Sequence, residues 1–574
     1  MTHSAQIEKL PRHFLPESLV IDKWETIEPY FKKLDERAIS NVTELEQWLK
    51  DSSELEAVIS EEVCWRQIRM TCDTENKSLE DAFTFFMMEI QPRMQPWADK
   101  LNRKLVDSPF TSQLDQPKYF TYLRNVRKNI DLFREENIPI QAELNVMQQQ
   151  FGVIAGKMTV EVNGKEYTLQ QAAKFLEDAD RSLRESVYRK INDRRVQDKD
   201  ELNLLFTGLL QKRNLVGMNA GFPNYRDFRF AELGRFDYTA NQCYQFHESV
   251  KQHVMPLVNQ IYEAKKQKLG LTDLKPWDVE AEPAGIEPLR PFKTGEELTE
   301  KTIRCFAELK PFFADCIRQM KEMKRLDLES RIGKAPGGYN CPLAETGAPF
   351  IFMNASGQLD DVTTMVHEGG HAVHSFLTHS LELNGFKDYP TEIAEVASMS
   401  MELFSMDHWH VFFDNAEELI RAKEQQLERV ITIFPWIATI DKFQHWIYEN
   451  PGHSETERAD KWMTILDEFS SPVIDFTGLD EYRRFAWQRQ LHLFEVPFYY
   501  IEYGIAQLGA IGLWKQFKEN PDKAIANYIN ALSLGGTRTL PELFNAAGLA
   551  FDFSSNNIST LMQFVKGEMD TLRV

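Results

Sequence analysis

The sequence predicts a mainly α-helical protein made of two lobes. Apolar residues recur at the spacing of amphipathic helices along most of the chain, and strand-like alternation is confined to a few short segments. The chain has 574 residues, more than one compact core normally contains, so two lobes are expected. We place their boundary at a charged run, residues 193–200, which gives an N-terminal helical lobe of residues 1–190 and a C-terminal domain of residues 191–574.

A β-hairpin is predicted at residues 159–169. Their alternating pattern is interrupted by Asn163-Gly164, a pair that strongly favours a two-residue hairpin turn. Thr168 and Gln171 then have the spacing of a capping box, in which each side chain accepts a backbone N–H of the other residue. This spacing predicts a helix that continues to about residue 188.

Composition argues against several classes of protein. The net charge of −21 disfavours nucleic acid as a partner, because phosphate binding needs a positive field. No apolar run approaches the roughly 18 residues of a membrane span, and the N-terminus has no basic segment followed by an apolar one. The six cysteines form no CxxC pair and suggest reduced thiols. We therefore expect a cytoplasmic protein without a membrane partner.

Two segments before residue 360 suggest contact with a ligand. Gly337 and Gly338 precede Tyr339 in a turn-rich stretch that is typical of a loop. Phe350 and Phe352 belong to a short apolar run of strand composition. An edge strand at this position could receive an extended peptide as an additional strand. The alternative is a buried strand next to an ordinary hairpin loop.

Residues 367–371 read His-Glu-Gly-Gly-His, within a helical pattern that covers residues 360–377. Residues four apart share one helix face, so His367 and His371 can direct imidazole nitrogens at one cation. Glu368 is rotated by about 100° from His367, which suits a general base that is not a metal ligand. Two glycines in a helix each cost about 1 kcal/mol relative to Ala, so we expect metal or substrate against the backbone. The alternative is a structural helix with two histidines.

A catalytic zinc ion usually has three protein ligands and one open position, so a third ligand must come from elsewhere. The segment after Pro390 has the pattern of a second helix and carries Glu392, Glu395 and Glu402. Spacing alone leaves these three carboxylates as alternatives.

These segments resemble the zinc metallopeptidases of the oligoendopeptidase F and thimet oligopeptidase type. In that family a Glu-x-x-Ser segment follows the HExxH helix, and Glu395 and Ser398 match it. The resemblance implies that Glu395 is the third ligand of one Zn²⁺ per chain. It also implies that His374 and Glu402 support the ligands through hydrogen bonds. Gly369 replaces the aromatic residue of the family's frequent HEFGH, which changes packing beside the site but no ligand.

A cluster of His and Tyr in this family lines the cleft and donates hydrogen bonds to the developing oxyanion. His492, Tyr499, Tyr500 and Tyr503 match it, although Pro497 makes one continuous helix doubtful. The resemblance makes His492, Tyr503 and Tyr499 catalytic candidates. Which of the three tyrosines faces the zinc is left open.

The family also has a Gly-rich loop and a strand before its zinc helix. The matching residues are Gly337, Gly338, Tyr339, Phe350 and Phe352, and the resemblance implies that they contact substrate. It further implies a two-lobed helical zinc-peptidase fold around a deep substrate channel, with a small β-sheet beside the HExxH helix. Residues 191–574 would then be the catalytic zinc metallopeptidase domain.

The function implied is hydrolysis of internal peptide bonds in short unstructured peptides. One alternative is a Taq-type zinc carboxypeptidase, which shares an HExxH helix with a downstream Glu and cuts from a free C-terminus. Another is a non-enzymatic protein that binds peptide or metal and has kept the fold. Glu368 and the complete ligand set favour an enzyme over such a relic.

Overall fold

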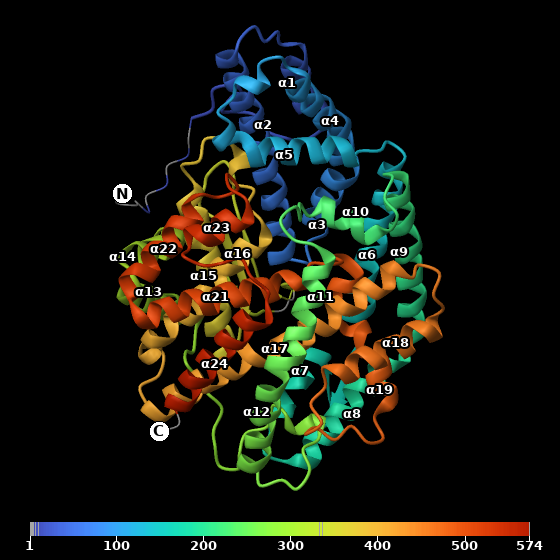
Figure 1. Cartoon of the computed structure of the whole chain (residues 1–574), viewed down its shortest axis with the longest axis vertical. Coiled ribbons are helices and arrows are strands. Elements are labelled where there is room, and N and C mark those ends of the chain that lie inside the picture. The colour runs from blue at the N-terminus through green and yellow to red at the C-terminus, as the bar shows by residue number, and fades with distance from the viewer. Residues whose placement is uncertain are drawn as a thin grey trace. The chain divides into compact units, whose positions relative to one another are not determined.

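The computed structural model describes residues 5, 7, 9, 11–331, 333–335 and 337–572, and most of them are helical (Figure 1). The prediction of a mainly α-helical chain is confirmed. The described residues form two compact units, each assembled from separate segments of the sequence. Within these residues, no helix combines the length and the apolar character that crossing a membrane requires.

The first unit comprises Met1–Phe133, Leu289–Lys423 and Ala506–Phe551. Its helices are α1 Trp24–Glu36, α2 Val42–Cys72, α3 Lys77–Phe85, α4 Gln91–Asp107, α5 Gln116–Leu132, α13 Gly295–Leu309, α14 Pro311–Glu322, α15 Leu359–Thr378, α16 Thr391–Ser405, α22 Pro521–Ser533 and α23 Leu540–Ala546. Its strands are β3 Leu326–Glu329, β4 Tyr339–Cys341 and β5 Phe350–Ala355.

The second unit comprises Arg134–Pro288, Glu424–Ile505 and Asp552–Val574. Its elements are α6 Asn137–Gly156, β1 Thr159–Val162, β2 Lys165–Thr168, α7 Leu169–Ala173, α8 Arg181–Gln197, α9 Lys199–Asn219, α10 Tyr225–Glu232, α11 Ala240–Ser249, α12 Met255–Lys268, α18 Glu455–Glu468, α19 Asp480–Arg484, α20 Leu491–Glu495 and α24 Ser555–Leu572. Two further helices, α17 Ala416–Glu449 and α21 Tyr500–Glu519, contain residues of both units.

The three-stranded sheet of the first unit has the order β3-β5-β4, with β5 parallel to β3 and antiparallel to β4. The expectation that β5 is an edge strand is wrong, because both of its backbone edges are already paired. The side chains of Phe350 and Phe352 are only 6% and 0% exposed. They pack into a hydrophobic cluster with Ile68 of α2, so their side chains belong to the core and do not face a substrate.

The sheet lies beside α15, as expected. The side-chain amide of Asn340 in β4 donates to the carbonyl oxygen of Glu368 at 3.2 Å. The edge strand on this side is β4, and Gly337 leads into it with a φ of +96°, a conformation that favours glycine. Any additional strand on this side of the sheet would therefore pair with β4.

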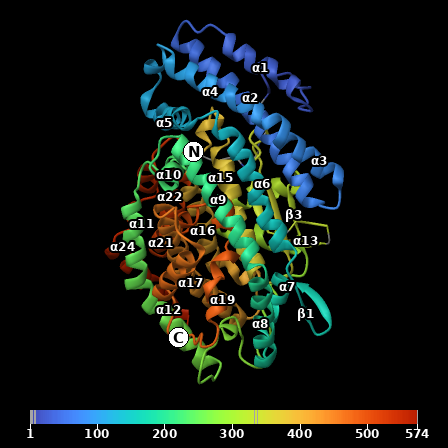
Figure 2. The same ribbon diagram turned by 90° about the vertical axis from the view of Figure 1, so that its right-hand side faces the viewer.

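The predicted hairpin is confirmed, and Figure 2 shows it beside α7. The capping box of Thr168 and Gln171 is also present. The helix after it does not continue to residue 188, because α7 passes into a short 3₁₀ turn and ends. Asp180 then caps the separate helix α8 by accepting the backbone N–H groups of Ser182 and Leu183. Since α8 runs through residue 190 within the second unit, the compact units differ from a division at that residue.

Candidate active site

Helix α15 begins at a capping box. Gln358 is the N-cap, and the Asp361 carboxylate accepts the backbone N–H groups of Ser356 and Gln358, both at 2.8 Å. A negative charge in the first turn also interacts favourably with the helix dipole. Asp360 and Asp361 thus both lie in the first turn of the helix. Asp361, three residues after the N-cap, stabilises the start of the helix.

The two glycines of the HEGGH motif serve helix packing. A Cβ atom on Gly370 would lie 2.6 Å from Cα of Ser398 and 2.7 Å from the carbonyl oxygen of Ala397, both in α16. A Cβ on Gly369 would lie 2.8 Å from the ring of Phe306 in α13. The glycines therefore allow neighbouring protein segments to approach the helix. Our expectation that metal or substrate lies against this backbone is wrong.

This close approach brings three candidate ligands together from α15 and α16. The ligand atoms of His367, His371 and Glu395 all lie within 4.8 Å of one another. The Glu395 carboxylate oxygen is 3.4 Å from Nε2 of His367 and 3.8 Å from Nε2 of His371. Ligand atoms around a tetrahedral zinc ion are about 3.3–3.5 Å apart, given bonds of about 2.0–2.1 Å. The three side chains therefore fit one Zn²⁺ ion.

Two further side chains orient these groups. Nδ1 of His367 is 2.7 Å from Glu402, which leaves Nε2 directed toward Glu395. The hydroxyl of Ser398 donates to the Glu395 carboxylate at 3.2 Å. Carboxylate and hydroxyl partners of this kind commonly fix the geometry of metal ligands. Of the three carboxylates that spacing left open, Glu395 faces both histidines and Glu402 supports one of them, and Glu392 is not part of the candidate ligand group.

The ionisable groups here have strongly shifted pKa values. Burial raises the pKa of Glu368 to about 7, and its Oε2 has no hydrogen-bond partner among the described residues. Burial lowers the pKa of His371 to about 4, so this imidazole is neutral near pH 7 and able to bind a metal. Burial also opposes protonation of His367, but hydrogen bonds to Glu395 and Glu402 outweigh it and hold that pKa well above its usual range.

His374, expected to support the ligands, is fully buried and stacks on Tyr389 with ring centroids 3.7 Å apart. A cavity of about 780 Å³ in the first unit is lined by Tyr389 and Ser375, together with residues of α2, α4 and α5. None of the three candidate ligands lines this cavity. We therefore assign it no part in the metal site.

The His and Tyr cluster predicted near the C-terminus lies in the second unit. The ring of His492 is 5.9 Å from Tyr499, 4.9 Å from Tyr500 and 5.9 Å from Tyr503 between centroids. His492 belongs to α20, Tyr500 and Tyr503 belong to α21, and Tyr499 lies in the turn between these helices, where Phe498 has a φ of 66°. The aromatic grouping predicted from the sequence is therefore present, although not on one continuous helix.

Sequence reasoning gave no role to Arg213 of α9. This residue is completely buried, and its guanidinium donates to the backbone carbonyls of Leu493 (2.9 Å) and Phe494 and to the hydroxyl of Tyr448. It thereby anchors α20, the helix that carries His492. The sequence did contain a signal for this role. Arg213 lies within an apolar helix pattern, where an unpaired charge would be costly, so a buried partner could have been expected.

The Gly-rich loop before β4 is held by neighbouring polar groups. The side-chain amide of Asn354 donates to the carbonyl oxygens of Ala335 and Gly337, both at 2.8 Å. The hydroxyl of Tyr339 lies 2.6 Å from that of Thr71, and its ring stacks on Phe352 at 4.8 Å. The loop backbone is thus held at Ala335 and Gly337, while Tyr339 packs against the sheet.

Comparison with known proteins gives consistent results. The family model described as peptidase family M3 matches residues 174–562, and that of the peptidase M3 N-terminal domain matches residues 14–133. An oligoendopeptidase F homologue of Lactococcus lactis is 22% identical over 415 residues, which cover 68% of this chain and 66% of the relative. One from Borreliella burgdorferi is 24% identical over 405 residues, covering 68% and 65%. The matched region thus spans slightly less than two thirds of these relatives.

A solved structure of PZ peptidase A with an inhibitor is 26% identical in sequence and superposes with a TM-score of 0.89, covering 95% of this chain and 97% of that one. The similarity therefore extends over nearly the whole fold, the N-terminal helices included. The two family models together cover α1–α5, both candidate ligand helices and the aromatic cluster. The chain belongs to peptidase family M3.

Proposed function

We propose that this protein is a zinc-dependent oligoendopeptidase that hydrolyses internal bonds of short unstructured peptides. The observation that carries the proposal is the convergence of His367, His371 and Glu395, with ligand atoms within 4.8 Å of one another. The names of the relatives support the same class of reaction, since both are named oligoendopeptidase F homologues.

The donor set suits zinc and suits catalysis. Two imidazole nitrogens and one carboxylate oxygen form a three-ligand set of the kind that leaves a fourth position open. Zn²⁺ in such a set supplies Lewis-acid chemistry, which makes water nucleophilic near neutral pH and polarises a carbonyl group. His367 is fixed for this role by Glu402, and Glu395 by Ser398.

We assign Glu368 the role of general base and then general acid. Its carboxylate follows a candidate ligand directly in the helix but does not belong to the ligand group. A pKa near 7 matches a group that accepts a proton from attacking water and returns it to the leaving amine at neutral pH. The unpartnered Oε2 atom is available for that proton.

His492, Tyr499 and Tyr503 remain our candidates for hydrogen-bond donors to the oxyanion, on the basis of the family resemblance. For substrate binding we propose backbone pairing of an extended peptide with β4, next to Gly337 and Gly338. Such pairing recognises the main chain and therefore tolerates varied side chains.

The test is mass spectrometry of products from a library of short peptides, including peptides blocked at both termini. We expect internal cuts in the blocked peptides. Cleavage that requires a free C-terminus would instead indicate a carboxypeptidase. The Glu368→Gln variant should bind zinc like the wild type, while its turnover falls by about 10²–10⁴-fold. Loss of zinc together with activity would contradict the assignment of Glu368 as base.

A further inference from the structure

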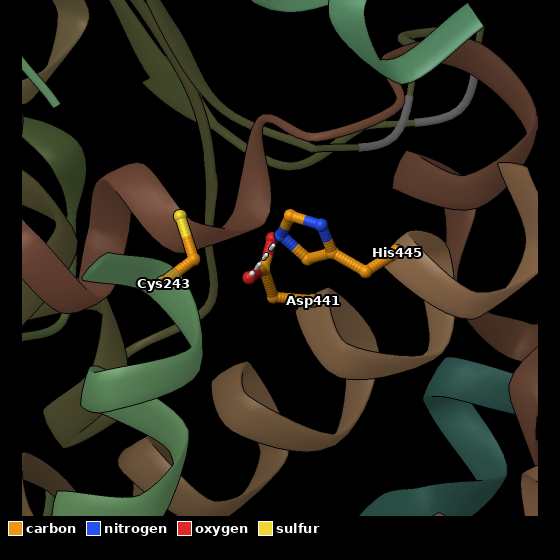
Figure 3. Close-up of side chains that lie close together, drawn as sticks. All are labelled: Cys243, Asp441 and His445. Atoms are coloured by element: carbon orange, nitrogen blue, oxygen red, sulfur yellow. Dashed lines mark ion pairs between the residues drawn. The ribbon is translucent and has the colours of Figure 1, made fainter. Parts of the chain in front are cut away.

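A second group of potential metal ligands lies in the second unit, between α11 and α17. Cys243 comes from α11, and Asp441 and His445 come from successive turns of α17 (Figure 3). Their ligand atoms lie within 4.8 Å of one another. All three residues are at most 2% exposed. The group contains three donor types that zinc binds: a thiol, an imidazole and a carboxylate.

Several polar atoms in this group lack partners. Oδ1 of Asp441 and Nδ1 of His445 form no hydrogen bond within the described part of the chain, and Nε2 of His445 has only an ion-pair contact with Asp441. Oδ2 of Asp441 lies 3.3 Å from Nε2 of His445 and makes a 2.8 Å hydrogen bond with Nε2 of His247. Buried side-chain polar atoms are normally paired, so several unpaired atoms at one point indicate that a further group binds there.

Apart from His247 and His445, the surroundings offer little compensation for the buried charge of Asp441. The rings of Tyr244, Phe498 and Phe230 pack around His445, with centroids 4.8, 5.3 and 5.8 Å away. The nearby guanidinium of Arg235 is engaged by Glu502 at 2.7 Å. A carboxylate in such an apolar environment needs a counter-charge.

Two sources of positive charge can be compared. A proton on one histidine would balance Asp441 but would leave most of the unpaired atoms as they are. A divalent cation would engage sulfur, oxygen and nitrogen together. Its two charges would balance one thiolate and one carboxylate. Burial keeps the free Cys243 thiol protonated by raising its pKa, whereas a bound metal deprotonates a coordinating thiol.

We propose that Cys243, Asp441 and His445 bind a second Zn²⁺ ion, with His247 as a positioning residue that holds the Asp441 carboxylate. This ion would be additional to the one per chain implied for the HExxH site. Ligand atoms around a tetrahedral ion are about 3.3–3.8 Å apart, so pairs in this group that are separated by up to 4.8 Å must draw together, whereas Nε2 of His445 and Oδ2 of Asp441 are already 3.3 Å apart. Because the group is fully buried and joins α11 to α17, the ion has a structural role and enters as the chain folds.

The test uses cobalt, because a thiolate bound to Co²⁺ gives a near-ultraviolet charge-transfer band that nitrogen and oxygen ligands do not give. Cys243 is the one cysteine of the second unit, and the HExxH site contains none. Full-length His371→Ala protein, produced in cobalt-supplemented medium, should show this band at one cobalt per chain. Zinc-grown wild type should contain two zinc ions per chain, and His371→Ala protein one.

The matched comparison introduces serine at two buried cysteines in the His371→Ala background. Cys243→Ser should abolish the band, whereas Cys305→Ser in α13 should keep it. Absence of the band in His371→Ala protein, or its persistence after Cys243→Ser, would overturn the proposal. The measurement on His371→Ala protein leaves Cys243, Asp441 and His445 intact, so it remains valid even if Cys243→Ser does not fold. No readout depends on peptidase activity, so failure of the proposed function would be seen separately.

Discussion

Replacing Gly370 with Ala should separate the two helices that carry the candidate ligands. The new Cβ atom would lie 2.6 Å from Cα of Ser398, a backbone atom of α16 that cannot move without its helix. Ordinary contact begins at 3.4 Å, so α15 and α16 must part by about 0.8 Å (3.4 minus 2.6). Glu395 lies one turn before Ser398 and would move with it.

The expected magnitude combines two opposing terms. Overpacking of a buried contact costs about 1–3 kcal/mol, and replacing Gly with Ala in a helix returns at most about 1 kcal/mol. The net loss of stability should therefore be about 0–3 kcal/mol. The effect on zinc should be larger, because metal–ligand distances tolerate deviations of only about 0.2 Å. Loss of a group that orients a metal ligand typically reduces metal affinity by about 10- to 100-fold, and we expect displacement of Glu395 to have an effect of that order.

The assay is zinc competition against a chelator, together with thermal unfolding of the metal-free protein. Gly567→Ala is the matched control, because Gly567 lies in α24 and its Cβ would meet nothing within 4 Å. That control should bind zinc normally and gain up to about 1 kcal/mol. If Gly370→Ala matched Gly567→Ala in both measurements, the helix contact would not set the ligand geometry.

Four further predictions concern the site and the stability of the second unit. Glu368 must be ionised to act as a base, so activity should fall as the pH drops through its pKa of about 7, or somewhat lower because a bound cation favours the carboxylate. Glu395→Ala should lose zinc affinity far more than Glu392→Ala. Asp278→Asn should cost about 3–5 kcal/mol near pH 7, because it leaves the buried guanidinium of Arg184 without its carboxylate partner. Short peptides should be cut much faster than casein.

Each of these predictions has a contradicting result. A pH profile that stays flat between pH 5 and pH 8 would remove Glu368 as the titrating base. Equal zinc loss in Glu392→Ala would mean that the wrong carboxylate was chosen. For Asp278, burial opposes ionisation, but hydrogen bonds from Arg181 and Arg184 outweigh it and lower its pKa. Its stabilising effect is therefore present above about pH 4 and is lost at lower pH, so a cost for Asp278→Asn that did not shrink in acid would refute the ion-pair explanation. Casein cut as fast as a short peptide would indicate an open site.

The sequence was sufficient where the chemistry is local. The HExxH spacing fixed His367 and His371 on one helix face, and Asn163-Gly164 fixed the hairpin turn. Both results depend on residues a few positions apart, for which helix and turn geometry leave little freedom. The break before α8 was equally local and was missed, because Asp180 was not weighed as an N-cap.

The sequence was insufficient where the answer depends on which elements become neighbours. An apolar run such as residues 350–355 suits a central strand and an edge strand equally well, and only the pairing of β5 with both β3 and β4 decides between them. Spacing also left three glutamates of α16 as alternatives. Which of them faces the two histidines depends on how α16 is rotated against α15.

That rotation has a visible cause in the two glycines of the motif. Gly370 precedes His371 and receives the backbone of Ser398, which lies three residues after Glu395. No side chain separates the two helices at this contact. The contact therefore fixes both the distance between the helices and the face of α16 that is turned toward the histidines. Gly369 similarly leaves room for the ring of Phe306 from α13. Gly370, which looked costly for a helix, is therefore the residue that lets the third candidate ligand come close enough to share one ion with the first two.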